Sequence, residues 1–173
     1  YFALSNEWPW GLMEFIRLAK IKNLPLVCTL QNSYSLINRI VELGMTEIFF
    51  REKLSFFSYS PLGFGHLSGK YLKDPRAAGR INLFPGYAQR YNKSGVEKAI
   101  EKYDALAAKR NLSLTDLALS FVYSQWFVTS TVIGATNIKQ LKQNIAAYGL
   151  DIVDEELIQE IDAIHLDVMN PAP

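Results

Sequence analysis

The chain has 173 residues, of which 49% are hydrophobic and 20% are charged, and its net charge is +1 at pH 7. This balance is typical of one globular domain with a core of its own, and it excludes a largely disordered chain. Lysine and arginine are spread along the chain and no apolar run approaches the roughly 20 residues of a membrane helix, so neither nucleic acid nor a membrane is an expected partner.

The first residues, YFALSNEWPW, carry neither the basic segment nor the cleavage pattern of a signal peptide. Because the chain begins abruptly and without methionine, we expect it to be the downstream part of a longer protein. Its single cysteine, Cys28 in LPLVCTL, is expected to be a small buried hydrophobe and neither a disulfide partner nor a nucleophile. A reducing cytoplasm is the location that this residue favours.

Four short apolar runs are predicted to be strands, at residues 2–5, 25–31, 54–60 and 128–134. Their apolar residues are continuous and do not alternate with polar ones, which predicts strands buried on both faces. Helical patterns separate the first three strands. One spans 10–22, and the other spans 35–50 with Gly44 as a candidate break. In the first of these helices the predicted inward face consists of Leu12, Phe15, Ile16 and Ala19.

Four further helices are predicted in the second half of the chain. The first spans 96–110, and the second spans 113–125 and opens with Ser113 and Asp116, an acidic variant of the capping box. The third spans 137–148, and the fourth begins at Asp154 as its N-cap. Their apolar positions, which recur at helical spacing, are Val96, Ala99, Ile100, Tyr103, Leu106 and Ala107, then Leu114, Leu117, Ala118, Phe121 and Val122, then Ile138, Leu141 and Ile145, and then Leu157, Ile158, Ile161 and Ile164.

The order of these elements is that of four βα units and a terminal helix, with crossovers long enough for parallel strand pairing. Such a chain is α/β, and it forms either half of an eight-stranded (β/α)8 barrel or most of an open doubly wound sheet. A long loop insertion at 64–95 precedes the helix at 96–110. Its part 71–95 holds two prolines and three glycines. A loop of that length inside a compact domain is more often functional than idle.

Polar or small residues stand where each predicted strand ends: Ser5–Asn6, Gln31–Asn32, Tyr59–Ser60 and Gly134–Ala135–Thr136. Because α/β proteins bind ligands at the carboxyl ends of their strands, these residues are expected to share one rim. The neutral amides and hydroxyls suit a heteroaromatic ring with a carboxamide, which Tyr59 stacks against while Ser5, Asn6 and Gln31 hold the amide. Taken singly, each residue is better explained as a turn or helix cap, and it is the coincidence of four such ends at one rim that favours a ligand.

Two places favour a phosphate. The stretch GATN leads directly into the predicted helix IKQLKQNI, where free N–H groups and the helix dipole attract an anion, helped by Thr136 and by Lys139 or Gln140. Lys70 and Arg80 in the long loop are candidates for a second phosphate contact. For each of these two cations alone, a solvated charge on a loop is the simpler explanation.

Other chemistries find little support. The chain has no GxGxxG, no P-loop and no GxSxG around Ser60. His66 and His165 are far apart and lack partners at metal-ligand spacing, so no metal site is expected. His66 lines a pocket or is a loop residue without function. No candidate general acid stands out, so no catalytic residue is predicted.

Four stretches carry a resemblance to a known family: SN after the first strand, then LQNSYSL, then YSPLGFGHLSGKY, then IGATNIKQLKQNI. In this order they resemble the C-terminal half of the aldo-keto reductases, in a branch similar to bacterial Tas-type proteins and potassium-channel β-subunits. The resemblance covers essentially the whole chain. It implies the C-terminal half of a TIM barrel, about four βα units plus a terminal helix, from an NADPH-dependent carbonyl reductase.

The resemblance also implies roles for single residues. Ser5, Asn6 and Gln31 hold the nicotinamide carboxamide, and Tyr59 stacks on the ring. The remaining cofactor residues fall into a pyrophosphate group, Ser60, Pro61, Leu62 and Gly63 with Lys70 and Arg80 nearby, and an adenosine group, Gly134, Thr136, Gln140, Gln143 and Asn144. Many members of the family carry Lys and Arg around the 2′-phosphate, where this chain has Ala135 and Gln140, so the preference of NADPH over NADH rests on the family alone.

The family's catalytic Asp, Tyr, Lys and His lie in the half of the barrel that this chain does not contain. Tyr34 and Tyr71 are not expected to replace that tyrosine. The isolated chain is therefore expected to be inactive, and its partners are a small carbonyl substrate and either an N-terminal half barrel or a second copy, because open edge strands invite pairing.

Two alternatives stay open, a regulatory subunit that senses nicotinamide nucleotides and a truncated product without function. The substrate pocket is expected to involve the tail MNPAP and the apolar residues Phe64, Phe84, Tyr87 and Tyr91.

Overall fold

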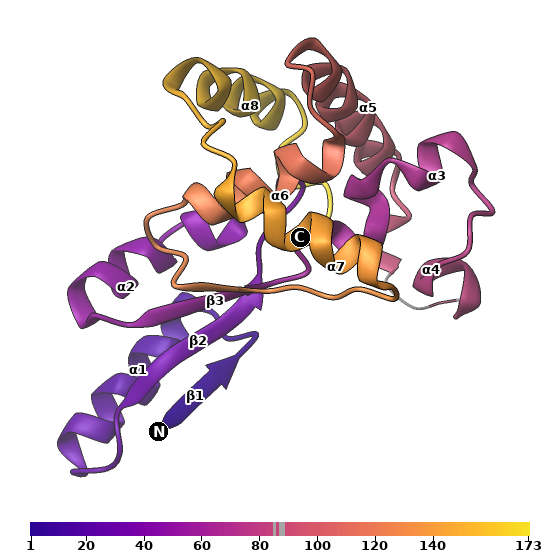
Figure 1. The fold of residues 1–173 in the computed structure, drawn as a ribbon. Helices are drawn as coiled ribbons and strands as arrows, with labels where there is room; N and C mark the ends of the chain where they lie inside the picture. Colours follow the sequence, from indigo (N-terminus) through magenta and orange to yellow (C-terminus); the bar gives the residue numbers. More distant parts are fainter. Residues whose placement is uncertain (85, 87–88) are drawn as a thin grey trace.

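The computed structural model describes residues 1–84, 86 and 89–173, and within them four strands form one parallel sheet in the order β1-β2-β3-β4 (Figure 1). The strands are β1 (Phe2–Ser5), β2 (Val27–Ser33), β3 (Ser55–Tyr59) and β4 (Ser130–Val132). Every neighbouring pair is parallel. This confirms the predicted strand–helix alternation and parallel pairing. Each crossover contains at least one helix, as a connection between parallel strands requires. Tyr87, predicted to line the pocket, lies outside the described residues.

Helices cover one face of this sheet. The register aligns Leu4, Leu30 and Phe56 on the face that packs against α1 (Pro9–Ile21) and α2 (Met45–Glu52). The ring of Phe49 in α2 stacks on that of Phe56, with 5.0 Å between centroids. Burying these side chains on one face of the sheet supplies the hydrophobic stabilisation that holds the βα units together.

The opposite face of the sheet is open, so the prediction of strands buried on both faces was wrong. Side chains alternate along a strand, and those of β3 alternate between half-buried and buried. β1 is mostly exposed, and Val132 of β4 retains 45% exposure. β1 and β4 are the two edge strands, and among the described residues no further strand pairs with their outer sides. Apolar continuity in the sequence cannot show whether a second layer exists.

Two smaller predictions also need correction. Phe15 does not share the buried face of Leu12 and Ile16 but is 43% exposed and packs against Phe2 at the β1 edge. Cys28 is only half-buried, and its Sγ–H donates to the carbonyl of Phe2 at 3.1 Å. Both residues lie near the β1 edge of the sheet, where a covering element is absent from the described residues.

The predicted helix at 35–50 exists only in its second half. Ser35 and Asn38 form an isolated antiparallel bridge, followed by η1 (Ile40–Glu42). Gly44 has a φ of +95° and marks the start of α2. A glycine adopts this left-handed conformation readily, so the break at Gly44 is confirmed, while the residues before it satisfy their backbone groups in a tight turn.

The long insertion folds into short helical turns: η2 (Gly63–Ser68), α3 (Lys70–Lys73), α4 (Arg80–Leu83) and η3 (Gln89–Tyr91). Aromatic contacts tie the turns together, since the ring of His66 packs between those of Tyr71 and Tyr91. This packing explains how a segment without a periodic pattern keeps a defined shape.

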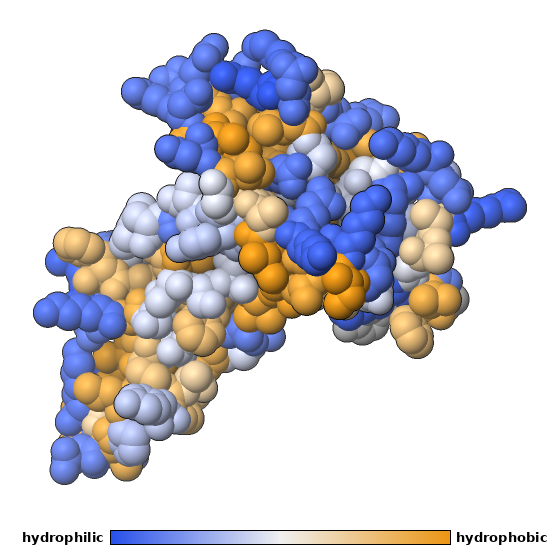
Figure 2. Space-filling model, viewed as in Figure 1, coloured by the Kyte–Doolittle hydropathy of each residue, from blue (hydrophilic) through white to orange (hydrophobic). Residues whose placement is uncertain are grey.

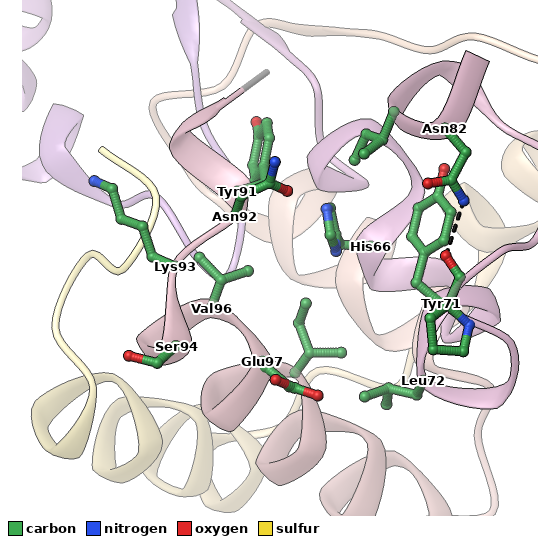
Figure 3. Close-up of a pocket in the computed structure, with 13 residues that line it drawn as sticks. His66, Tyr71, Leu72, Asn82, Tyr91, Asn92, Lys93, Ser94, Val96 and Glu97 are labelled. Carbon is green, nitrogen blue, oxygen red and sulfur yellow. Dashed lines mark hydrogen bonds between the residues drawn. The ribbon is translucent and has the colours of Figure 1, made fainter. Parts of the chain in front are cut away.

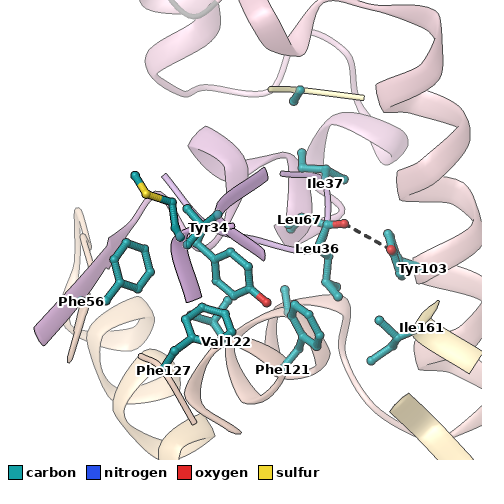
Figure 4. Close-up of a cluster of buried hydrophobic side chains, with 14 of the residues drawn as sticks. Tyr34, Leu36, Ile37, Phe56, Leu67, Tyr103, Phe121, Val122, Phe127 and Ile161 are labelled. Atoms are coloured by element: carbon teal, nitrogen blue, oxygen red, sulfur yellow. Dashed lines mark hydrogen bonds between the residues drawn. The ribbon is translucent and has the colours of Figure 1, made fainter. Parts of the chain in front are cut away.

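The remaining helices are α5 (Ser94–Lys109), α6 (Leu114–Ser124), α7 (Ile138–Ala146), followed by η4 (Ala147–Gly149), and α8 (Glu155–Asp167). The predicted caps are confirmed, because Ser113 Oγ accepts from the amide of Asp116, and the Asp154 carboxylate accepts from the amide of Leu157. The main core lies between α5, α6, α8 and the loop after β2, with Tyr34, Phe121 and Phe127 at its centre (Figure 4).

The apolar face of α7 is exposed. Ile138 retains 67% of its accessible surface and Ile145 60%, although the predicted spacing places both on one face with Leu141. Figure 2 shows this apolar surface over α7. Among the described residues, no helix is both long and apolar enough to cross a membrane.

The C-terminal segment is pinned to the loop after β2. The backbone amide of Arg39 donates to Asn170 Oδ1 at 2.6 Å, and the amide of Ala172 donates to the carbonyl of Ile37 at 3.1 Å. Ala172 is buried, and Pro171 lies beside Gly95 at the start of α5, where an added Cβ would come within 3.5 Å of Pro171 Cβ. The segment therefore joins the β2 loop to α5.

Candidate functional site

The predicted rim residues do converge at the carboxyl edge of the sheet. Ser5 pairs with Gln31 in the β-ladder, and the amide of Asn6 donates to the carbonyl of Gln31 at 3.0 Å. The hydroxyl of Tyr59 donates to Asn6 Oδ1 at 2.7 Å, and Asn6 Nδ2 donates to Ser5 Oγ at 3.2 Å. Alternation places Ser5, Gln31 and Tyr59 on the open face of the sheet, opposite the helices.

Asn6 holds this arrangement through an uncommon backbone conformation. Its φ is +57°, in the left-handed region that asparagine tolerates better than most residues. This turn leaves its side-chain amide beside the Tyr59 hydroxyl. The result is a chain of amide and hydroxyl groups next to a half-buried aromatic ring, which can bind a flat ligand with its own amide.

Two further polar atoms lie at this rim, one on Asn32, which the sequence had placed there without a role, and one on Ser33, which it had not singled out. Asn32 Oδ1 and Ser33 Oγ are buried and have no hydrogen-bond partner among the described residues, although Asn32 Nδ2 donates to the carbonyl of Glu7. A buried acceptor without a partner is costly. The signal for these residues in the sequence was their position directly after the predicted strand. In the structure β2 continues two residues past Gln31 and includes both of them.

The turn after β3 is tight and buried. Ser60 has a φ of +55°, and the amide of Gly63 donates to its carbonyl at 2.9 Å. Pro61 and Gly63 are buried, and Leu62 packs against the core. Gly63 has a φ of +53°, and a Cβ there would come within 2.9 Å of Ile37 Cδ1. Only glycine fits, so the backbone of Ser60–Gly63 presents a fixed edge beside Tyr59.

Lys70 and Arg80 lie within the folded insertion and both contact aromatic rings. Lys70 Nζ donates to the carbonyl of Ala78 at 3.0 Å and lies 4.7 Å from the centre of the Tyr71 ring. The Arg80 guanidinium lies 5.4 Å from the centre of the Phe64 ring. Cation–π contacts of this kind orient the two cations. The carbonyl that Lys70 contacts is only two residues before Arg80, so the loop keeps the two cations on neighbouring segments.

The turn between β4 and α7 is the candidate anion site. Asn137 caps α7, its side chain accepting from the amide of Gln140 at 2.9 Å. Gln140 Oε1 accepts from both the amide and the hydroxyl of Thr136, at 2.9 and 3.0 Å. The Gln140 amide group therefore occupies the donors that were predicted to meet a phosphate, and an anion binds Thr136 only if Gln140 turns away.

Gln143 and Asn144 serve the scaffold. Asn144 is 3% exposed, and its Nδ2 donates to the carbonyl of Gly134 at 3.1 Å. Gln143 Nε2 donates to Ser113 Oγ and to Asp116 at the start of α6. Asn144 thus holds the β4–α7 turn through its hydrogen bond to Gly134, and Gln143 joins α7 to α6. Their predicted contact with adenosine stays a prediction.

Neither of the two tyrosines set aside as proton donors presents an accessible hydroxyl. The Tyr34 hydroxyl is buried and donates to Glu42 Oε1 at 2.5 Å, and burial, followed by the charge of Glu42, raises the pKa of Tyr34 well above its ordinary value. A substrate cannot reach that hydroxyl. The Tyr71 hydroxyl is also buried, and it lies against Gly79, where a Cβ would come within 2.2 Å of it.

Comparison with known families identifies the chain. The model of the Aldo/keto reductase family matches residues 1–165. The chain belongs to the aldo/keto reductase family. Members of this family are oxidoreductases, and the family generally uses NAD(P)H.

The similar proteins are longer than this chain, which covers between 50% and 62% of their length. The chain is 40% identical over 173 residues to Protein tas of Escherichia coli (strain K12), a match covering all of this chain and 50% of that protein. It is 36% identical over 179 residues to an aldo-keto reductase of Babesia bovis, covering 99% of this chain and 62% of that protein. It is 26% identical over 172 residues to a probable voltage-gated potassium channel subunit beta of Oryza sativa subsp. japonica, covering 90% and 51%.

The greater length of these relatives agrees with the open, four-stranded sheet of this chain. A parallel sheet of four strands with helices on one face is half of the closed barrel of eight strands, in which the other face lines the interior. The chain spans about half of Protein tas. The fold is thus an α/β partial TIM barrel, and the polar rim of Ser5, Gln31 and Tyr59 lies on the face that is interior in a complete barrel.

Proposed function

We propose that this chain is the cofactor-binding part of an NADPH-dependent carbonyl reductase, acting on a small aldehyde or ketone. The observation that carries the proposal is the convergence of Ser5, Asn6, Gln31 and Tyr59 on one edge of the sheet, including the 2.7 Å bond between Tyr59 and Asn6. The group fits the nicotinamide, because amide and hydroxyl groups match a carboxamide and the Tyr59 ring offers a flat surface.

The remaining contacts follow the course of the cofactor. Ser60, Pro61, Leu62 and Gly63 form the backbone edge for the pyrophosphate, with Lys70 and Arg80 as its counter-charges. The β4–α7 turn, from Gly134 to Thr136, receives the adenosine end at a helix N-terminus. When bound, NADPH supplies the hydride; the chain's own residues bind the ring, orient it and shield one of its faces.

We further propose that the isolated chain does not reduce carbonyls. Reduction needs a proton donor beside the carbonyl oxygen. Tyr34 is buried in an ion-pair network, and no other residue at the described rim has the geometry of a positioned acid. Turnover therefore requires a second half barrel, either an N-terminal half or a partner of similar shape. A cytoplasmic location stays a prediction based on the single cysteine.

A regulatory role is the second candidate. The similarity to a probable potassium channel subunit beta is the observation that favours it. Such a protein binds the nucleotide but turns over negligibly, even as a complete barrel. Measuring aldehyde reduction by the barrel completed with its upstream half distinguishes the two functions, since a sensor leaves NADPH unoxidised while a reductase consumes it with the aldehyde.

The first experiment is a fluorescence titration of the protein with NADPH and, separately, with NADH, following tryptophan quenching. We expect saturable binding that weakens at least about tenfold in Tyr59→Ala, because the ring and its bond to Asn6 are both lost. Tyr59→Phe is the matched control, which keeps the ring and loses only the hydroxyl. Binding of neither nucleotide, or equal affinity in Tyr59→Ala, contradicts the proposed site.

A further inference from the structure

A cavity of about 350 Å³ lies between the long insertion and the start of α5 (Figure 3). Residues of η2 and α3 line one side, and residues from Tyr91 to Ile100 line the other. Among the residues that the structure describes, this lining shares no member with those assigned to the cofactor. Tyr91, which was expected to line the substrate pocket, also lines this cavity, while the other lining residues have no role in the proposed reaction.

The walls of the cavity are mainly aromatic and aliphatic. The His66 ring lies between two tyrosine rings, 5.0 Å from that of Tyr71 and 5.5 Å from that of Tyr91. Val96 and Ile100 of α5, both buried, add an aliphatic surface. Concave sites of this size and composition bind small flat molecules by burial and ring contacts.

Two polar atoms at this cavity are unsatisfied among the described residues, and the Tyr71 hydroxyl is one of them. The other, His66 Nε2, is also buried and has no hydrogen-bond partner among the described residues. Burial, helped by the charge of Lys70, lowers the pKa of His66 to about 4, so the ring is neutral at pH 7. A neutral imidazole nitrogen either donates or accepts, depending on the tautomer. A phenolic hydroxyl does both, and therefore pairs with Nε2 in either case.

The charge of the cavity favours an uncharged ligand. Among the described residues, its lining carries one basic side chain, Lys93, and one acidic side chain, Glu97, both exposed. These opposite charges leave no net attraction for an anion or a cation. A cavity of about 150 Å³ holds a benzene molecule, so this one has room for about two fused rings.

We propose that this cavity binds a small uncharged aromatic alcohol of one or two rings, with its hydroxyl at His66 Nε2 and its rings against Tyr91 and Val96. The site belongs to the insertion and α5. It does not depend on the nucleotide site, so failure of one proposal leaves the other standing.

The test compares two matched probes by fluorine NMR, 6-fluoro-2-naphthol and 2-fluoronaphthalene, which differ only in the hydroxyl. We expect saturable binding of the naphthol, about tenfold tighter than the naphthalene, because only the naphthol satisfies the buried nitrogen. Amide shifts of the protein should be confined to 66–72 and 91–100. Equal affinities, no saturable binding, or shifts centred elsewhere overturn the proposal.

A pair of histidine variants then locates the hydroxyl. His66→Phe keeps a ring but removes Nε2, and we expect the preference for the naphthol to disappear. His165→Phe is the matched control, because His165 Nδ1 is also buried without a partner among the described residues but lies on α8, outside the cavity. A preference that survives in His66→Phe or is lost in His165→Phe contradicts the assignment. The comparison of probes on the unaltered protein does not depend on either variant folding.

Discussion

At the scale of single residues, the contacts of Gln140 bear on the choice of cofactor. Its Oε1 accepts from both the amide and the hydroxyl of Thr136, and it carries no charge. A 2′-phosphate is better bound by a guanidinium, which offers charge and a bidentate geometry. In this chain a neutral amide already satisfies the donors of the turn, so discrimination between NADPH and NADH is expected to be weak.

Replacing Gln140 by arginine should raise the affinity for NADPH. We expect about a tenfold gain (about 1.4 kcal/mol) from one charge-assisted phosphate contact, with the affinity for NADH nearly unchanged because NADH lacks that phosphate. The measurement is a nucleotide titration of both proteins, with NADH as the internal control. A parallel gain for NADH would place the effect at the pyrophosphate or in the fold.

His66 also predicts a pH dependence of stability. Its pKa in the folded protein is lowered to about 4, first by burial and then by Lys70, while an unfolded histidine titrates near 6.5. Between these values the unfolded chain binds a proton that the folded chain does not. Stability is therefore full above about pH 6.5 and falls as the pH is lowered towards 4.

Urea unfolding between pH 7 and pH 4.5 measures this effect. We expect His66→Phe to remove about 1 kcal/mol of the pH dependence, less than full linkage, because the ring is partly exposed. The pKa of His165 is also lowered by burial, so a smaller slope of the same sign should remain. If the pH dependence of stability were unchanged in His66→Phe, His66 would take up its proton as readily in the folded protein as in the unfolded chain.

At the scale of elements, the strands and long helices were predictable because apolar period and length determine them. The helix at 35–50 failed in its first half, where Ser35 and Asn38 pair across a turn. The rim residues were predictable from strand ends alone. The bond between Asn6 and Tyr59 was not, because it joins residues 53 positions apart through a left-handed backbone conformation. The contacts of His66 likewise depend on how the insertion folds.

The β4–α7 turn gives a prediction at this scale. Asn144→Ala removes the bond to the Gly134 carbonyl and leaves that acceptor without its partner. We expect a loss of about 1–3 kcal/mol in the free energy of unfolding. We also expect weaker NADPH binding, because the turn loses the hydrogen bond that holds it in place.

Asp154→Ala is the control for this variant, measured by urea unfolding and nucleotide titration. It removes the cap of α8 at a cost of about 1 kcal/mol and should leave NADPH affinity unchanged. If both variants weakened binding in proportion to stability, the effect of Asn144 would be on folding alone.

At the scale of the whole molecule, two open edges and an apolar helix face stand out. β1 and β4 lack outer neighbours among the described residues, and α7 exposes Ile138 and Ile145. Unpaired edges and apolar patches are sites of association. We propose that a second half barrel, from an N-terminal half or another copy, covers both strand edges at once, because parallel strands would continue the sheet on each side.

Sedimentation velocity tests this arrangement on the 173-residue protein. We expect association that grows with protein concentration, and a shift towards monomer in the double variant Ile138→Glu and Ile145→Glu. Lys142→Glu is the control on the same helix, and it should change the charge without affecting association. A single sharp monomer boundary at every concentration contradicts the expected pairing.

The contact between the C-terminal segment and the loop after β2 also bears on the order of folding. Asn170 and Arg39 meet across 131 residues of chain, so their contact closes a very long loop. Such contacts are entropically expensive to form early, and we expect this one to form after the rate-limiting step. Weakening it should then accelerate unfolding and leave the folding rate nearly unchanged. The segment therefore prolongs the lifetime of the native state without helping the chain to reach it.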